Sequence, residues 1–308
     1  MLQLDEDPTE AWAMLHRRLQ ALQQQRVEKQ EFLARLEQIA AGIDHLTRMR
    51  QDDSLFVLVQ MLFDREFGYS ATHALLSATT CGIIAPIAGL PDDDRAPLTR
   101  AALTMNIGMS QLHDQLAQQV QPADSAQRAQ IAEHPRLSTA FLRECGVDDP
   151  LWLQLVDDHH ESPDGSGYPG GKTDLPMAQQ MLHMSDVFVA RISPRSSRRG
   201  LAPNVAVGNL YLEAQEQSSQ LGAIFVKQLG MYPPGTYVRL KSEETAVVVR
   251  RGQRVNTPVA MAIADAEGMP LTTPSRRDTQ IPTYGVKGSV APEDIKIRMD
   301  KSRLLKRI

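Results

Sequence analysis

The first fifty residues place apolar side chains with the period of a helix. Residues 9–50 contain one glycine and no proline, and Thr9 after Pro8 is a candidate N-cap. Apolar residues recur at intervals of three and four, first at Leu15, Leu19 and Leu22 and then at Phe32, Leu36, Ile39, Ile43 and Leu46. This stripe favours a helical hairpin that packs on a main domain and bends in the glutamine-rich stretch 20–30. A coiled coil joining two subunits is the second interpretation, because the heptad pattern lasts barely two repeats.

The next part of the chain also has helical periodicity. Helices are predicted at about 55–66, 70–89, 95–118, 124–144, 148–159, 176–192 and 203–228. Glycine and proline separate them, as in 89–94 and 195–204. Beyond Pro233 the period changes, and strands are predicted at 236–240, 245–251 and 258–264. We therefore expect a mainly α fold: an N-terminal helical region at 1–54, a helical domain at 55–229, and a β-rich extension with a C-terminal tail at 230–308.

Composition narrows the class of protein. The 308 residues carry a net charge of −4, which gives no sign of a nucleic-acid binder. The segment from Lys287 to Ile308 has a local excess of positive charge, and a solvated, partly ordered tail is the expectation there. Cys81 and Cys145 lie in apolar sequence and are expected to be free buried thiols. We find no signal-peptide pattern and no apolar run of membrane-spanning length, so a cytoplasmic protein is expected.

One stretch concentrates candidate chemistry. Residues 157–171 read DDHHESPDGSGYPGG, with His159 and His160 directly before a loop rich in glycine. Neighbours on a helix point about 100° apart, so both imidazoles can face one site only near a helix end. The loop supplies such an end. Imidazole is a common ligand of zinc, iron and manganese, and the pair is therefore a candidate metal site.

These residues carry a family resemblance. HHESPDGSGYP (159–169) resembles the HHE…DGSGYP signature of the HD-GYP family, bacterial phosphodiesterases that hydrolyse cyclic di-GMP. The resemblance covers about residues 55–265 and implies a helical HD-type domain followed by a small β extension. The metal ligands that it implies are His73, His134, His159, His160 and Asp186. If the protein is active, Asp186 would also be catalytic by positioning water.

The resemblance extends to ligand contacts. Arg195 and Arg198 fall on positions that hold ligand phosphates in the family. The GYP loop is identified by Asp164, Gly165, Gly167, Tyr168 and Pro169. In the family this loop resembles a docking surface for GGDEF-type proteins. Tyr69 stands where members with three metals carry a glutamate, so a third metal is not expected.

The chain departs from the family at the residues that name it. Met105, Asn106 and Met109 stand in LTMNIGMS where the family has histidine, aspartate and lysine. Two cations about 3.5 to 4 Å apart need an anionic bridge, which in the family is that aspartate. A neutral Asn106 cannot supply the charge. We therefore expect one divalent metal (iron, manganese or zinc) on the three later histidines, or none.

A second His-Asp pair, His113-Asp114, lies eight residues beyond the expected place. On a continuous helix that offset rotates the side chains by about 80° and moves them by about 12 Å. The pair is therefore expected to lie outside the site. His45 and His183 match no motif and are expected to be structural.

Two functions compete at this stage. The first is a degenerate HD-GYP-type protein of cyclic di-GMP signalling that binds the nucleotide, a GGDEF-type protein, or both, with little or no hydrolysis. The second is an active metal-dependent phosphodiesterase with a one-metal or altered two-metal site. A scaffold that forms a homodimer through its N-terminal helices is the third reading.

Overall fold

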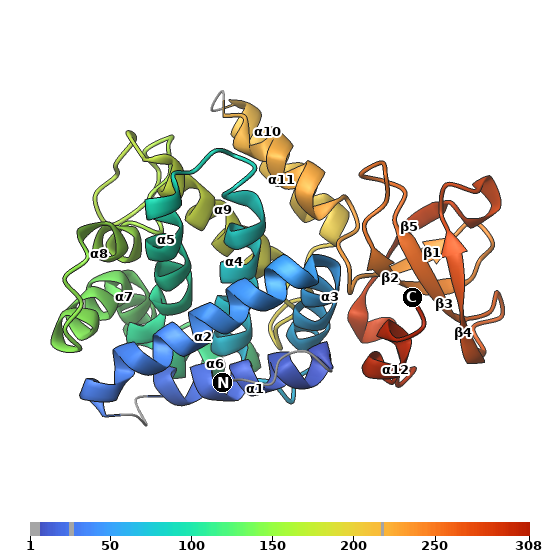
Figure 1. Ribbon diagram of the computed structural model, residues 1–308, viewed down its shortest axis with the longest axis horizontal. Coiled ribbons are helices and arrows are strands. Elements are labelled where there is room, and N and C mark those ends of the chain that lie inside the picture. The colour runs from blue at the N-terminus through green and yellow to red at the C-terminus, as the bar shows by residue number, and fades with distance from the viewer. Residues whose placement is uncertain (1–6, 25–27, 217–218) are drawn as a thin grey trace.

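The computed structural model describes residues 7–24, 28–216 and 219–308. The predicted hairpin consists of α1 (Pro8–Gln23) and α2 (Lys29–Met49), which lie against each other and against the helices of the main domain (Figure 1). The predicted apolar stripe is buried there, including Trp12, Leu15 and Ile39. The hairpin is thus confirmed. The bend predicted within 20–30 partly falls on residues 25–27, outside the described residues, and the homodimer through these helices stays a prediction.

The helical domain is built around α4 (Tyr69–Ile84), which is buried almost along its whole length. In Figure 1 it lies among α2, α3 (Gln51–Leu62), α5 (Asp92–Thr104) and α9 (Met177–Ile192). The remaining helices of this domain are α6 (Ser110–Gln118), α7 (Ser125–Glu144), α8 (Pro150–Asp157), α10 (Pro203–Glu216) and α11 (Leu221–Leu229). The mainly α fold is confirmed.

The single helix predicted at 95–118 is wrong. Instead α5 ends at Thr104, a 3₁₀ turn covers Ile107–Met109, and α6 begins at Ser110. A Cβ on Gly108 would lie 2.7 Å from Ser138 N and 2.9 Å from His134 O of α7. Gly108 N donates to Ser138 Oγ at 3.0 Å, and Ser138 Oγ donates to Met105 O at 2.8 Å. Packing against α7 thus decides where the helix breaks, and sequence periodicity does not report it.

The C-terminal module is a five-stranded antiparallel sheet in the order β4-β3-β2-β1-β5 (Figure 1). Its strands are β1 (Tyr237–Leu240), β2 (Thr245–Arg250), β3 (Val259–Ala264), β4 (Pro270–Asp278) and β5 (Val286–Val290). The first three confirm the predicted strands, and the last two were missed. The module contacts α3, where Gln60 donates to Gly235 O at 2.6 Å and Arg251 pairs with Asp52 at 2.5 Å.

The basic tail, expected to be solvated and partly ordered, contains a strand and a short helix, and most of its Lys and Arg side chains are exposed. β5 pairs with β1, and α12 (Lys301–Leu305) packs on α1 with Leu304 and Leu305 buried. Some of its positive charges have acidic partners: Lys287 pairs with Glu243, and Lys301 with Asp64. Among the helices that the structure describes, none combines the length and apolarity needed to cross a bilayer.

Candidate metal centre

Three histidines converge at one point. His134 lies in α7, and His159 and His160 follow the last residue of α8. One ring nitrogen of each lies within 4.8 Å of those of the other two. The structure therefore brings together the three residues that the family resemblance assigns to one metal.

Backbone carbonyls fix the tautomers of two of these rings. His134 Nδ1 lies 2.5 Å from Ile131 O, and His159 Nδ1 lies 2.7 Å from Val156 O. A carbonyl only accepts, so each Nδ1 carries the hydrogen and each Nε2 keeps its lone pair. The two Nε2 atoms lie 3.0 Å apart. Two nitrogen ligands about 2.1 Å from a tetrahedral zinc ion lie about 3.4 Å apart, so this donor set fits a divalent cation.

Burial keeps the three rings neutral. It lowers the pKa of His134 to about 4, and the repulsion that a protonated His160 would exert is a second cause. It also holds the pKa of His159 well below the ordinary value, and lowers that of His160. Neutral imidazole is the form that ligates a metal. The three rings are thus ready to bind a cation at neutral pH.

A second pair of predicted ligands lies beside this cluster. His73 Nε2 donates to Asp186 Oδ1 at 2.7 Å, and the other oxygen of Asp186 lies 4.0 Å from His160 Nδ1. Burial by itself would raise the pKa of Asp186, but the His73 hydrogen bond and the nearby imidazoles outweigh it and hold that pKa below its usual range. An ionised Asp186 therefore links His73 to the cluster.

The glycine-rich loop supports the histidines. Glu161 is fully buried, and its carboxylate accepts from Gly170 N at 2.5 Å and from Lys172 N at 2.9 Å. A Cβ on Gly167 would lie 2.5 Å from His160 O, so no other residue fits there. The Tyr168 ring then stacks on His160, with centroids 4.6 Å apart. The loop that follows the two histidines thus orients His160.

Other loop residues reach the surface. Asp164 accepts from Ser166 N at 3.0 Å, a turn in which Gly165 takes a φ of +76°. Asp164 and Pro169 are exposed. The GYP loop therefore has an inner face on the histidines and an outer face toward solvent.

His183, expected to be structural, has its Nδ1 3.1 Å from His159 O.

The replaced dipeptide lies against α7, the helix that carries His134. Met105 and Asn106 are buried, and Asn106 Oδ1 has no hydrogen-bond partner. The Gly108 turn binds them to the part of α7 that carries His134. Met109, third of the replaced positions, is half-buried. A neutral amide thus stands in the segment where the family resemblance requires an anion.

The expected position of His113 is wrong. Because the 3₁₀ turn interrupts the helix, His113 is turned into the interior, with its ring centroid 5.3 Å from that of His73 and 4.6 Å from that of Tyr69. It is 5% exposed, and its Nδ1 has no hydrogen-bond partner. Asp114 points elsewhere and accepts from Ser70 N at 2.8 Å at the start of α4. The two residues of this pair therefore have separate surroundings.

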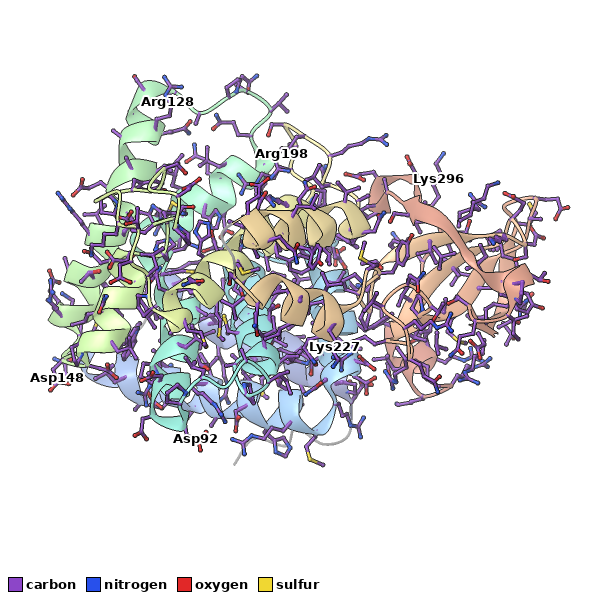
Figure 2. All side chains as sticks on the ribbon, turned by 90° about the horizontal axis from the view of Figure 1, so that it is seen from above. Asp92, Arg128, Asp148, Arg198, Lys227 and Lys296 are labelled. Atoms are coloured by element: carbon purple, nitrogen blue, oxygen red, sulfur yellow. The ribbon has the colours of Figure 1, made fainter. Side chains whose placement is uncertain are left out.

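The two predicted phosphate ligands differ in placement. Arg195 Nη2 donates to the Tyr69 hydroxyl at 3.0 Å, and that hydroxyl lies 3.2 Å from His73 Nδ1. Arg195 Nε is buried without a partner. Arg198, labelled in the loop after α9 in Figure 2, donates to Ala190 O at 2.7 Å. Arg195 therefore belongs to the site, whereas Arg198 contacts the end of α9. Sequence reasoning missed the Tyr69 bridge, for which the four-residue spacing from His73 was the available signal.

The sequence of this chain matches a known family over the region that carries the histidine site. A sequence model described as an HD domain matches residues 57–218, more than half of the chain. The chain belongs to the HD-domain family. The fold agrees with the resemblance to HD-GYP proteins, since an HDGYP protein from Bdellovibrio bacteriovorus superimposes with a TM-score of 0.51 over 73% of each chain, at 14% identity.

Curated relatives of this HD domain carry enzyme names. The chain is 27% identical over 220 residues to a cyclic di-GMP phosphodiesterase of Pseudomonas aeruginosa, covering 68% of the chain and 51% of that protein. It is 25% identical over 213 residues to a cyclic di-GMP phosphodiesterase response regulator of Xanthomonas campestris pv. campestris, covering 67% and 55%. The chain thus spans about half the length of these relatives.

Proposed function

We propose that this chain is a degenerate HD-GYP-type protein of cyclic di-GMP signalling, which binds one divalent cation and a cyclic dinucleotide with little or no hydrolysis. Two observations carry the proposal: Asn106 is neutral and buried in the segment that packs on the helix of His134, and the three imidazoles His134, His159 and His160 lie together. One half of the site keeps its ligands, and the bridge to the other half lacks its charge.

Charge decides between one cation and two. Two divalent ions a few ångströms apart repel strongly in a buried site, and the family bridges them with a carboxylate. Here Asp186 is the one carboxylate for which a contact with the imidazoles is described, and it is already bonded to His73. A single cation on His134, His159 and His160 needs no bridge. When bound, this cation would attract a phosphate oxygen and neutralise part of the negative charge of the phosphate.

Arg195 supplies the second attraction for a phosphate. Its Nε is buried, unpaired and held beside Tyr69. An arginine fork binds phosphate oxygens at two points, which suits the phosphodiester of a cyclic dinucleotide. The choice of cyclic di-GMP is supported by the names of the relatives from Pseudomonas and Xanthomonas. A relative named as a 3′3′-cGAMP-specific phosphodiesterase of Vibrio cholerae makes that nucleotide the comparison ligand.

The test combines metal content, binding and turnover on purified protein loaded separately with Mn²⁺, Fe²⁺ and Zn²⁺. We expect one equivalent of metal, cyclic di-GMP binding by calorimetry, and no more than trace turnover. An Arg195→Ala variant should lose nucleotide affinity and keep the metal. Robust turnover that His160→Ala abolishes would contradict the proposal.

An active phosphodiesterase is the second candidate, and His113 favours it. The His113 ring, whose Nδ1 has no hydrogen-bond partner, lies near the His73–Asp186 pair, where the family's missing histidine would complete a second set of ligands. Two equivalents of metal together with turnover would support it. A Met105→His, Asn106→Asp, Met109→Lys variant should gain activity in either case if the other ligands are competent.

The outer face of the GYP loop is the part of the site open to a protein partner. Asp164 and Pro169 are exposed while Tyr168 stays on His160. A GGDEF-type protein would dock there without displacing the histidines. The Asp164→Lys variant should bind a purified GGDEF protein more weakly than the wild type does and should keep its own metal content. Unchanged binding of the GGDEF protein would exclude this face as the docking surface.

A further inference from the structure

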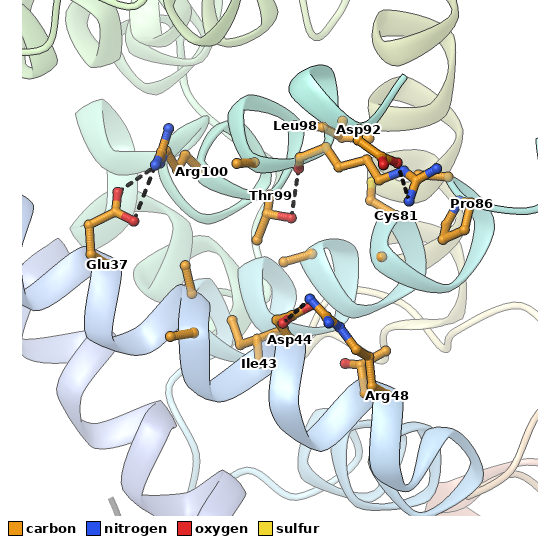
Figure 3. A pocket seen from close by; sticks show the side chains of 18 of the residues that line it. Glu37, Ile43, Asp44, Arg48, Cys81, Pro86, Asp92, Leu98, Thr99 and Arg100 are labelled. Atoms are coloured by element: carbon orange, nitrogen blue, oxygen red, sulfur yellow. Dashed lines mark hydrogen bonds and ion pairs between the residues drawn. The ribbon is translucent and has the colours of Figure 1, made fainter. Parts of the chain in front are cut away.

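A cavity lies apart from the histidine site, between α2, α4 and α5 (Figure 3). Its volume is about 720 Å³, within the range of pockets that bind small molecules. Small residues form much of its wall, among them Ala40, Ala78, Gly82 and Ala85. A Cβ on Gly82 would meet no atom within 4 Å, so open space lies directly above this residue. None of the ligands named above lines the cavity.

The charges around the cavity are paired. Arg100 binds Glu37 at 2.7 Å and Arg48 binds Asp44 at 2.5 Å, as dashed lines in Figure 3 show. Arg95 binds Asp92 at 2.7 Å. A charged ligand would have to compete with these partners. The wall therefore suits an uncharged molecule.

One polar group in the wall lacks a partner. Thr47 is 5% exposed, and its hydroxyl makes no hydrogen bond. Leaving a buried hydroxyl unpaired is costly, and a rotation of the Thr47 side chain that turns its hydroxyl into the cavity would let a ligand with a donor or acceptor remove that cost. The cavity thus combines apolar walls with one hydrogen-bonding point, which is the usual composition of a small-molecule site.

Helix α4 lines the cavity, and its contacts with α9 connect the cavity with the metal centre. Cys81, in the cavity wall, donates to Ser185 Oγ at 3.2 Å, and burial keeps it a thiol by raising its pKa to about 12. Ser185 precedes Asp186 on α9. On α4, His73 lies about 12 Å along the axis from Cys81 and bonds to Asp186. Any shift of α4 against α9 at Cys81 therefore changes the geometry at Asp186.

We propose that this cavity is an effector site for an uncharged, mainly apolar small molecule, and that its occupancy alters the metal centre through the Cys81–Ser185 contact. Figure 2 places Asp92, at the rim of the cavity, on the opposite side of the helical domain from Arg198. Because none of the three clustered histidines lines the cavity, an effector could bind while a nucleotide occupies the metal centre. The coupling rests on the proposed metal site, whereas the binding does not.

Binding is tested with N-phenyl-1-naphthylamine, an uncharged dye whose fluorescence rises in apolar surroundings. Gly82→Leu should fill the cavity and weaken dye binding at least about tenfold. Gly208→Leu is the matched control, because a Cβ on this helical glycine of α10 also meets no atom within 4 Å and it does not line the cavity. Its affinity should stay within about twofold of wild type. Thr47→Val should weaken binding about two- to tenfold.

Coupling is tested by repeating the dye titration in saturating Zn²⁺. We expect the affinity to change several-fold in the wild type, with the reciprocal change in zinc affinity, and not to change in Cys81→Ala. Dye binding that is equal in Gly82→Leu and wild type would overturn the cavity site and leave the metal site untouched. Equal dye affinity with and without zinc would overturn the coupling. If the wild type takes up no zinc while dye binding still depends on Gly82, the metal site and the coupling fail and the cavity site stands.

Discussion

His134 Nε2 and His159 Nε2 face each other at 3.0 Å, and the Nδ1–H of each ring donates a hydrogen bond to a backbone carbonyl of its own segment. Neither ring can turn its lone pair away without losing a buried hydrogen bond. The two lone pairs therefore form a fixed pair of ligands from residues that are 25 positions apart in the sequence.

The first prediction concerns this pair. His159→Ala should lower zinc affinity at least about 100-fold, because even the loss of a group that only orients a metal ligand typically costs 10- to 100-fold. Competition with a chelator of known affinity measures the change. His45→Ala serves as the control, since His45 is exposed on α2, and it should bind zinc like the wild type. If all three proteins bound zinc with equal affinity, His159 would not be a metal ligand.

The second prediction is that Glu161, the glutamate of the HHE motif, stabilises the loop and, unlike the histidines, does not bind the metal. Glu161→Gln should reduce the free energy of unfolding by about 1–3 kcal/mol, because the amide offers one acceptor where the carboxylate accepts from Gly170 N and Lys172 N. Urea denaturation of the metal-free protein measures it. The metal equivalents bound should not change. Loss of one full equivalent at unchanged stability would make Glu161 a ligand instead.

The third prediction concerns the residue beside His113. Asp114→Ala should cost about 0.5–2 kcal/mol of stability, since the carboxylate accepts from Ser70 N at the first turn of α4. Asp114→Asn keeps an acceptor and should lose less. Thermal and urea unfolding compare the two variants. A variant that unfolds like the wild type but binds less metal would place Asp114 in the metal centre.

The fourth prediction is a pH dependence. Burial lowers the pKa of His16, whose Nε2 donates to Gly68 O at 3.1 Å. The unfolded chain, with a histidine pKa of about 6.5, therefore binds more protons than the folded chain as the pH falls below that value. The stability from neutral His16 is complete above the unfolded pKa and is lost as the pH falls through the lower, folded one.

The measurement compares wild type with His16→Gln, whose amide nitrogen can still donate to Gly68 O. The free energy of unfolding, measured by urea denaturation of metal-free protein between neutral and mildly acidic pH, should fall less steeply in the variant. Identical slopes would show that His16 does not contribute to the pH dependence.

Local pattern was enough for much of the fold. The stripe from Leu15 to Leu46 predicted the hairpin, because burial of one helix face leaves a period in the sequence. Short apolar, β-branched runs in 236–264 predicted the first three strands, which are buried along most of their length. The strands β4 and β5 have mixed, half-exposed residues and leave no such period. They pair with β3 and β1 through backbone bonds, which composition does not record.

The sequence by itself determined which side chains are available for chemistry: adjacent histidines before a glycine loop, and an uncharged Asn106 where the family has an anion. Only the tertiary structure decided where they point. Packing of Gly108 on α7 breaks the helix and turns His113 toward His73, while Asp114 binds the start of α4. The reason is physical. A side chain's direction after a helix break depends on contacts with residues distant in the sequence, and periodicity describes only neighbours along the chain.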